Sequence, residues 1–205
     1  MRFALLLTGL LALSACGAKS VWAPDAQVQK ARYTHNAPTS VSLITTKNVG
    51  SGNGAHTALL VNASERVLFD PAGSMSHPNI PERNDVIMGA NPAVVDYFID
   101  FQTRKEFFTT VQTVDVPPTV AEDLLRRVKA HGAVAGAMCT SSTSALLRAT
   151  PGFESLGRAM FPTRLEDNFA TLANVRTVEF RDPVDSEEKW VLYNWVGQVP
   201  RYAID

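Results

Sequence analysis

The chain of 205 residues has no excess of charge of either sign, because 19 Lys and Arg nearly balance 20 Asp and Glu. Without a basic surplus, nothing in the composition indicates nucleic-acid binding. The sequence also has no internal repeat, no low-complexity run and, beyond its amino terminus, no apolar stretch long enough to cross a membrane. With 45% hydrophobic residues, these absences predict one globular domain with a sizeable core.

The amino terminus, MRFALLLTGLLALSAC, has the layout of a secretory signal. Arg2 precedes a short apolar run over residues 3–13, and small residues lead to Cys16. Residues 13–16 (Leu-Ser-Ala-Cys) resemble the lipobox of bacterial lipoproteins. The resemblance implies cleavage before Cys16, a diacylglycerol on its sulfur and acylation of the new amino terminus, which together anchor a protein stably. An ordinary cleaved signal is the alternative.

The residue after the lipobox bears on location. Gly17, rather than Asp, is the pattern of outer-membrane rather than inner-membrane sorting in a cell with two membranes. We therefore expect a signal peptide over residues 1–15, a lipid-anchored tether and approach segment over 16–40, and a single domain over 41–205. The expected location is the periplasm-facing cell envelope, with the membrane as partner through Cys16 and no nucleic acid.

Local patterns predict an α+β fold, with an antiparallel sheet and helices packed against it. Thr119 to Glu122 and Thr163 to Glu166 each have the pattern of a capping box at a helix start. Residues 72–92 read as a loop. Strands are predicted over residues 41–49, 56–62, 66–70, 107–116, 175–180 and 189–195, and helices over 93–104, 119–131, from 139 to 149 and from 163.

The strands at 56–62 and 66–70 form a predicted hairpin whose register is informative. A three-residue loop pairs Asn62 with Arg66 and Ala58 with Asp70, which places Asp70 diagonal to His56 on one face of the sheet. A two-residue loop would put Asp70 on the opposite face. Alternatively, Asp70 serves only to start the turn before a proline.

The sequence has two cysteines, Cys16 and Cys139. If Cys16 carries the lipid, Cys139 has no disulfide partner within this exported chain. It stands at a predicted helix start among small polar residues, where the helix dipole favours a thiolate. A nucleophilic cysteine needs a base, usually histidine, oriented by a third group. The alternative for Cys139 is a small buried hydrophobic residue.

Of the four histidines, His56 is the strongest candidate base, because it lies at the mouth of a strand where a rigid scaffold presents it. His35 lies in the approach segment, His77 in a loop and His131 at a helix end. A purely structural role for His56 is the alternative. A metal site of His56, Asp70 and His77 is weaker, because dense ligand spacing is absent; no metal or other cofactor is expected.

Two stretches, GAHTALLVN…RVLFDPAGS and MCTSSTSALL, resemble the circularly permuted branch of the NlpC-type papain-like cysteine hydrolases. The similarity covers residues 41–147, with the histidine strand ahead of the cysteine helix. It implies a papain-like fold with Cys139 as nucleophile, His56 as base and Asp70 as orienting residue. Met138 stands where the family has Asp or Asn, and Asp70 where His, Asn, Gln or Glu is usual. The stretch ERNDVIMG is similar to a family turn, with Asn84 in place of glycine.

The expected function is that of a lipid-anchored cell-envelope cysteine hydrolase cleaving an amide or ester. The resemblance implies peptidoglycan stem peptides as substrates, and the branch also includes acyltransferase-like and lipid-acting members. The alternative is a catalytically inactive papain-like lipoprotein for binding or envelope assembly.

Overall fold

The computed structural model describes residues 17–73 and 75–181, which form one antiparallel sheet and five α-helices. The strands are β1 (Ser40–Asn48), β2 (Gly54–Asn62), β3 (Arg66–Phe69), β4 (Glu82–Arg83), β5 (Val86–Met88), β6 (Phe107–Asp115) and β7 (Arg176–Phe180). The helices are α2 (Asp25–Ala31), α3 (Pro92–Gln102), α4 (Pro118–Ala130), α5 (Cys139–Arg148) and α6 (Pro162–Phe169), with a 3-10 turn η2 (Glu154–Leu156). The predicted α+β class is confirmed.

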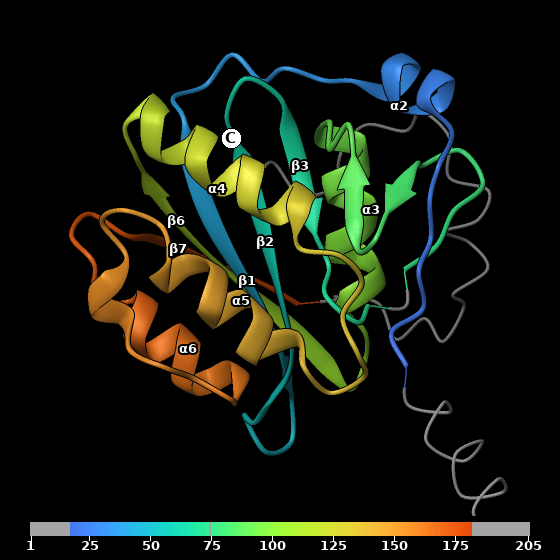
Figure 1. The fold of residues 1–205 in the computed structure, drawn as a ribbon. Helices are drawn as coiled ribbons and strands as arrows, with labels where there is room; N and C mark the ends of the chain where they lie inside the picture. Colours follow the sequence, from blue (N-terminus) through green and yellow to red (C-terminus); the bar gives the residue numbers. More distant parts are fainter. Residues whose placement is uncertain (1–16, 74, 182–205) are drawn as a thin grey trace, which may run out of the picture.

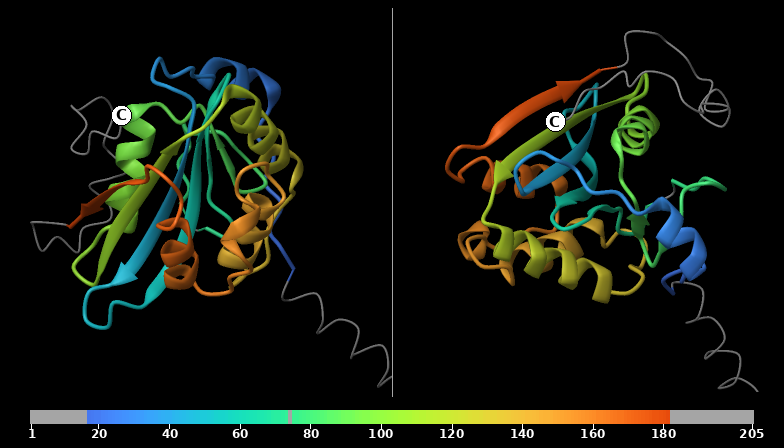
Figure 2. Two further views of the ribbon diagram at one scale, coloured as in Figure 1. Left: turned by 90° about the vertical axis from the view of Figure 1, so that its left-hand side faces the viewer. Right: turned by 90° about the horizontal axis from the view of Figure 1, so that it is seen from above.

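The strand order is β4-β5-β3-β2-β1-β6-β7, so β1 and β2 lie near the middle of the sheet (Figure 1). Helices α4, α5 and α6 cover one face, and α3 covers the other (Figures 1 and 2). Successive residues of β1 therefore enter different cores: Leu43 packs toward α4–α6 and Ile44 toward α3. Each large side chain buried in this way contributes about 1.5–3 kcal/mol. Burial on both faces explains why these strands are apolar without strict alternation.

The segment before the sheet is attached to the domain along much of its length. The Ser20 hydroxyl donates to the Asn84 side chain over 2.8 Å, and the Ala23 amide donates to the Glu82 carbonyl over 2.9 Å. Helix α2 follows, a helix that the sequence patterns do not predict. The domain's contacts thus begin at residue 20, only four residues after Cys16.

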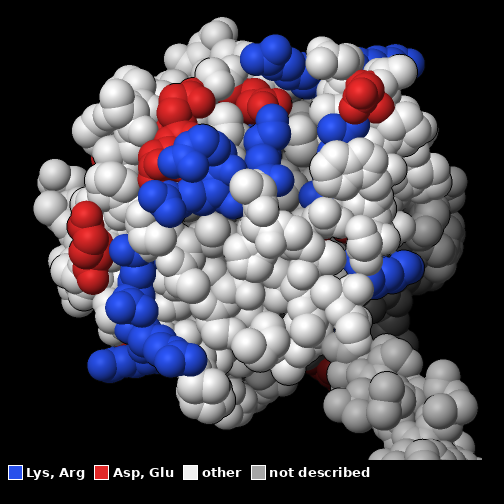
Figure 3. All heavy atoms as spheres, in the orientation of Figure 1, with Lys and Arg blue, Asp and Glu red and all other residues white. Residues whose placement is uncertain are grey.

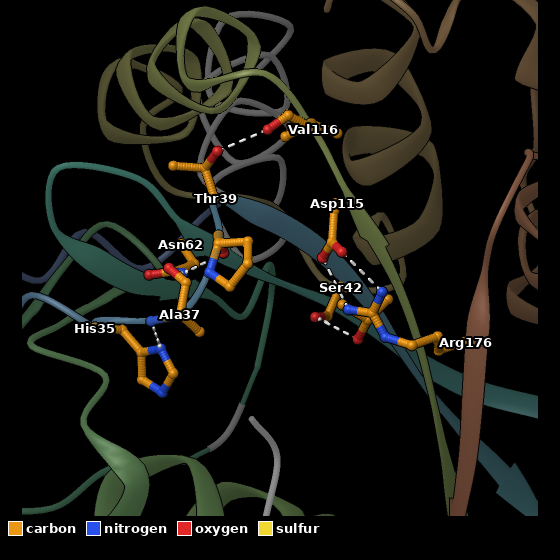
Figure 4. Close-up of polar contacts among 10 residues, drawn as sticks. His35, Ala37, Thr39, Ser42, Asn62, Asp115, Val116 and Arg176 are labelled. Carbon is orange, nitrogen blue, oxygen red and sulfur yellow. Dashed lines mark hydrogen bonds and ion pairs between the residues drawn. The ribbon is translucent and has the colours of Figure 1, made fainter.

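The last residues before β1 are also tied to the sheet (Figure 4). The Thr39 hydroxyl donates to the Val116 carbonyl over 2.6 Å, and the Asn62 side chain donates to the Pro38 carbonyl over 2.9 Å. On β6 and β7, both oxygens of Asp115 accept from the Arg176 guanidinium over 2.8 and 2.9 Å. The first two contacts join the approach segment to the sheet, and the third joins β6 to β7.

Both predicted capping boxes are wrong. Helix α4 begins at Pro118 and α6 at Pro162, and neither has a side-chain cap. Proline is well suited to the first helical position, since its fixed φ is helical and its missing N–H is not needed there. The two glutamates instead reach other elements: Glu122 accepts the Ser64 amide, and Glu166 pairs with Lys47 on β1 at 2.8 Å.

The region 72–92, predicted as a loop, contains the short strands β4 and β5. Strands of two and three residues are too short for a periodic pattern. The predicted signal peptide, Cys16 and the strand over 189–195 lie outside the described residues. Within the described part of the chain, no helix has the length and apolarity needed to cross a membrane.

Candidate active site

The site forms where β2 extends beyond its partner β3. The ladder between them runs from Asn62–Arg66 to Leu59–Phe69, so the loop has three residues, as predicted. The ladder ends there, one position before the expected Ala58–Asp70 pair, which is not formed. The Asp70 amide faces the other neighbouring strand, β5, and donates to the Asp85 carbonyl over 2.8 Å in register with the β3–β5 ladder. The first half of β2 is left without a strand on this side, which gives other elements access to it.

His56 and Asp70 lie together at this edge. The Nε2 atom of His56 is 2.6 Å from Oδ1 of Asp70, a distance of a short charge-assisted hydrogen bond. The Asp70 side chain is 4% exposed and that of His56 17%, so the contact is largely shielded from water. Because Nε2 is occupied by Asp70, Nδ1 remains for a second partner. The predicted proximity of these two residues is confirmed.

Cys139 is the first residue of α5, and its thiol is half-buried. The first backbone bond of this helix runs from the Ser142 amide to the Met138 carbonyl, so the preceding amides lie at the open helix start. Met138 occupies the cap position, is 45% exposed and makes no side-chain cap. The sulfur therefore stands in the positive field of a helix amino terminus.

The side chains of Cys139 and His56 shift each other's pKa in opposite directions. Burial acts to lower the pKa of His56, but hydrogen bonds to Asp70 and Cys139 and their charges raise it from 6.5 to about 10. Burial acts to raise the pKa of the Cys139 thiol, but the hydrogen bond and charge of His56 and hydrogen bonds from Thr140 outweigh it, so this pKa is lowered. Both shifts favour the thiolate–imidazolium pair over the neutral thiol and imidazole.

A buried hydrogen bond between threonines joins the strand and the helix beside this pair. The hydroxyls of Thr57 and Thr140 are 3.0 Å apart, and both residues are at most 1% exposed. Thr57 follows His56 and Thr140 follows Cys139, so the bond links their backbones. The Thr140 hydroxyl also lies 3.8 Å from the Cys139 sulfur. Sequence reasoning missed Thr57, because threonine is common in strands.

The other three histidines make contacts away from Cys139. The His35 ring accepts the Ala37 amide, the His77 ring packs edge-on against Tyr97, and the His131 ring packs against Phe69. Among the described residues, no group of three His, Cys, Asp or Glu side chains is placed to hold a metal ion. The expected alternative of a site with His56, Asp70 and His77 therefore finds no support.

Charged side chains lie on two sides of an uncharged area on the face that carries α5. Figure 3 shows basic and acidic side chains gathered over α4, an uncharged area below them, and further basic side chains at the lower left. Two surface hollows, of about 280 and 540 Å³, lie beside α2, and neither is lined by Cys139 or His56. The open cleft expected at Cys139 stays a prediction.

No protein-family model, curated protein or solved structure matches this chain. What defines its class is then the geometry itself. The chain is an α+β protein in which a central strand and the start of a helix bring a cysteine close to a hydrogen-bonded histidine–aspartate pair.

Proposed function

We propose that this chain is a lipid-anchored cysteine hydrolase of the bacterial cell envelope that cleaves an amide or an ester. The observation that carries the proposal is the series Asp70–His56–Cys139, in which the acid bonds the imidazole and the imidazole lowers the pKa of the thiol. A cysteine that only fills space in an apolar core would have a raised pKa. Here the thiol is half-buried and its pKa is lowered.

In the proposed reaction, the Cys139 thiolate attacks the carbonyl carbon and forms a C–S bond, while the carbonyl oxygen becomes an oxyanion. Backbone amides at the start of α5 are suited to stabilise that oxyanion. The intermediate then expels the amine or alcohol, which takes its proton from the His56 imidazolium. Neutral His56 next removes a proton from water, and the resulting hydroxide adds to the thioester carbon. The C–S bond then breaks, which releases the carboxylic acid and restores the Cys139 thiolate beside the His56 imidazolium.

Asp70 has the role of orienting and charging the imidazole. Its contact with Nε2 keeps Nδ1 directed to the thiol and stabilises the imidazolium form. The strand that carries His56 precedes the helix that carries Cys139, and the helix packs on that strand. This order supports a permuted NlpC-type papain-like fold. A peptidoglycan stem peptide or an acyl lipid is the proposed substrate class, presented to a domain held at the membrane through Cys16.

The test is the pH profile of alkylation by iodoacetamide in the purified full chain, read from the peptide that contains Cys139 so that Cys16 does not contribute. We expect an apparent pKa well below the ordinary value of about 8.5 and a return toward that value in His56→Ala. His35→Ala is the matched control and leaves the profile unchanged. A profile of an ordinary thiol that is indifferent to His56→Ala contradicts the proposal.

A measurement of substrate turnover distinguishes the proposed hydrolase from an inactive binding protein. Purified peptidoglycan fragments and fatty-acyl esters are incubated with the full chain and with Cys139→Ser. Release of product only by the unmodified chain supports hydrolysis. An activated thiol without turnover of either substrate favours an inactive papain-like lipoprotein for binding or envelope assembly.

A further inference from the structure

Asp85 closes the turn between β4 and β5 in the left-handed backbone conformation, which aspartate adopts less readily than glycine does. Arg83 pairs with Val86, so Asn84 and Asp85 form a two-residue hairpin loop, with φ of 46° and 66°. Both central residues of such a turn need positive φ, and glycine is the residue of choice at the second position. A non-glycine residue kept there requires compensation from its surroundings.

The carboxylate of Asp85 supplies that compensation. Its Oδ2 atom accepts the amide N–H of Val134 over 2.8 Å and that of Ala72 over 3.1 Å. The Asp85 carbonyl also accepts the Asp70 amide over 2.8 Å. Asp85 is only 8% exposed, so these are shielded, charge-assisted bonds.

The three bonds connect the segments that carry the site. Ala72 lies two residues after Asp70, in the turn that follows β3. Val134 lies five residues before Cys139, in the loop between α4 and α5, and its side chain is buried in the core with those helices. One side chain therefore fixes the acid-bearing turn relative to the loop that leads to the cysteine.

We propose that Asp85 is a positioning residue of the Cys139–His56–Asp70 site, which sets the distance between the Asp70 turn and the start of α5. It does not touch the reacting atoms. The inference rests on the proposed function, since it concerns the geometry of that thiol–imidazole–carboxylate series. Because the β2–β3 ladder ends at Phe69, β2 does not fix the Asp70 turn, and Asp85 holds it through its backbone carbonyl and its carboxylate.

The test compares two substitutions at Asp85 in the full chain, again by the pH profile of iodoacetamide labelling at Cys139. Asp85→Gly suits the positive φ of the turn but removes the carboxylate. We expect its labelling rate at pH 6 to fall about tenfold or more and its apparent thiol pKa to rise, because small misplacements of reacting groups are costly. Asp85→Asn keeps an oxygen that accepts both amides, so we expect labelling within about threefold of the unmodified chain.

Asn84→Gly is the matched control, since Asn84 shares the turn and the positive φ, but its side chain bonds Ser20 and not the site segments. Its profile should equal that of the unmodified chain. The inference is overturned if the labelling profile of Asp85→Gly equals that of the unmodified chain. It is also overturned if the labelling rate falls as much in Asp85→Asn or Asn84→Gly as it does in Asp85→Gly. An ordinary thiol profile in the unmodified chain, indifferent to His56→Ala, overturns the proposed function and this inference together.

A change in labelling counts for positioning only if the protein remains folded, which circular dichroism and urea unfolding establish. Should Asp85→Gly fail to fold, amide hydrogen exchange in the unmodified chain decides the matter. Slow exchange at Val134 and Ala72 in the unmodified chain supports the two bonds, and it should stay slow in Asp85→Asn, which keeps the accepting oxygen. Fast exchange at Val134 in the unmodified chain overturns the inference.

Discussion

The α-carbon of Gly73 lies directly against the carboxylate of Asp70, so that an added Cβ would stand 1.8 Å from Oδ2 and 2.1 Å from Cγ. The Gly73 amide also donates to the Asp70 carbonyl over 2.9 Å. The turn thus closes around the acid that holds His56. A side chain at position 73 has no space unless Asp70 moves.

Gly73→Ala should therefore disturb both stability and the site. We expect the free energy of unfolding to fall by about 1–3 kcal/mol, because the methyl group displaces backbone or carboxylate. Labelling of Cys139 should move toward that of an ordinary thiol. Urea unfolding and the alkylation profile measure the two effects. Gly136→Ala is the control in the loop before Cys139, where a Cβ would meet nothing within 4 Å. Equal stability of the two variants would show that the contact at Gly73 is not tight.

Asp70→Asn should change how stability depends on pH. Asp70 helps to raise the pKa of His56 above its unfolded value of 6.5, so the stabilisation is fully present below pH 6.5 and is lost as pH rises through the raised pKa. The loss in free energy of unfolding caused by Asp70→Asn should thus be largest below pH 6.5 and shrink at higher pH. Urea unfolding between about pH 6 and pH 10 measures it.

The comparison is made in a Cys139→Ser background, so that the thiol does not titrate. Without the charge of Cys139, the upper end of the window lies below the pKa of about 10 found in the intact site. The two proteins compared are the Cys139→Ser chain with and without Asp70→Asn. A difference in their free energies of unfolding that stays constant across the pH range would contradict the role given to Asp70.

The hydrogen bond between Thr57 and Thr140 should be measurable by a double-mutant cycle. Thr57→Val or Thr140→Val leaves the partner hydroxyl buried without its bond, so each should cost about 1–3 kcal/mol. The double variant should cost less than the sum, with a coupling energy of about 1 kcal/mol. Thr140→Val should also raise the pKa of Cys139, because the Thr140 hydroxyl bond helps to lower it.

Thr143→Val is the control for this cycle. Thr143 is fully buried on the same helix, and within the described part of the chain its hydroxyl has no hydrogen-bond partner. Its replacement should be neutral or stabilising, since no bond is lost and a polar atom leaves the core. Additive effects at Thr57 and Thr140 would mean that their hydroxyls do not interact energetically.

Much of the fold is predictable because its signals are local. The hairpin of β2 and β3 follows from apolar runs separated by three residues, and Asn62 pairs with Arg66 as expected. The start of α5 at Cys139 follows from small polar residues before a helical pattern. The predicted starts of α4 and α6 were wrong by one residue. Each helix begins at a proline, and the threonine after it has the sequence pattern of a cap but lies inside the helix.

Within the candidate site, only the contact between residues of the same hairpin could be predicted from the sequence. His56 and Asp70 are 14 residues apart within one hairpin, so their contact follows from strand geometry. Thr57 and Thr140 are 83 residues apart, and Asp85 and Val134 are 49 apart. Contacts at such separations depend on how helices pack on the sheet, which periodicity does not encode.

The sequence by itself determined that the chain has an α+β pattern, a lone cysteine at a helix start and a histidine at a strand mouth, because each depends on a few neighbouring residues. Only the tertiary structure decided that α5 packs against β2 where β3 has ended, so that Cys139 reaches His56. The physical reason is that helix–sheet packing depends on residues far apart in the chain, such as Thr57 and Thr140, whose hydroxyls meet across that contact. The buried carboxylate of Asp85 likewise ties the Asp70 turn to the loop before the cysteine.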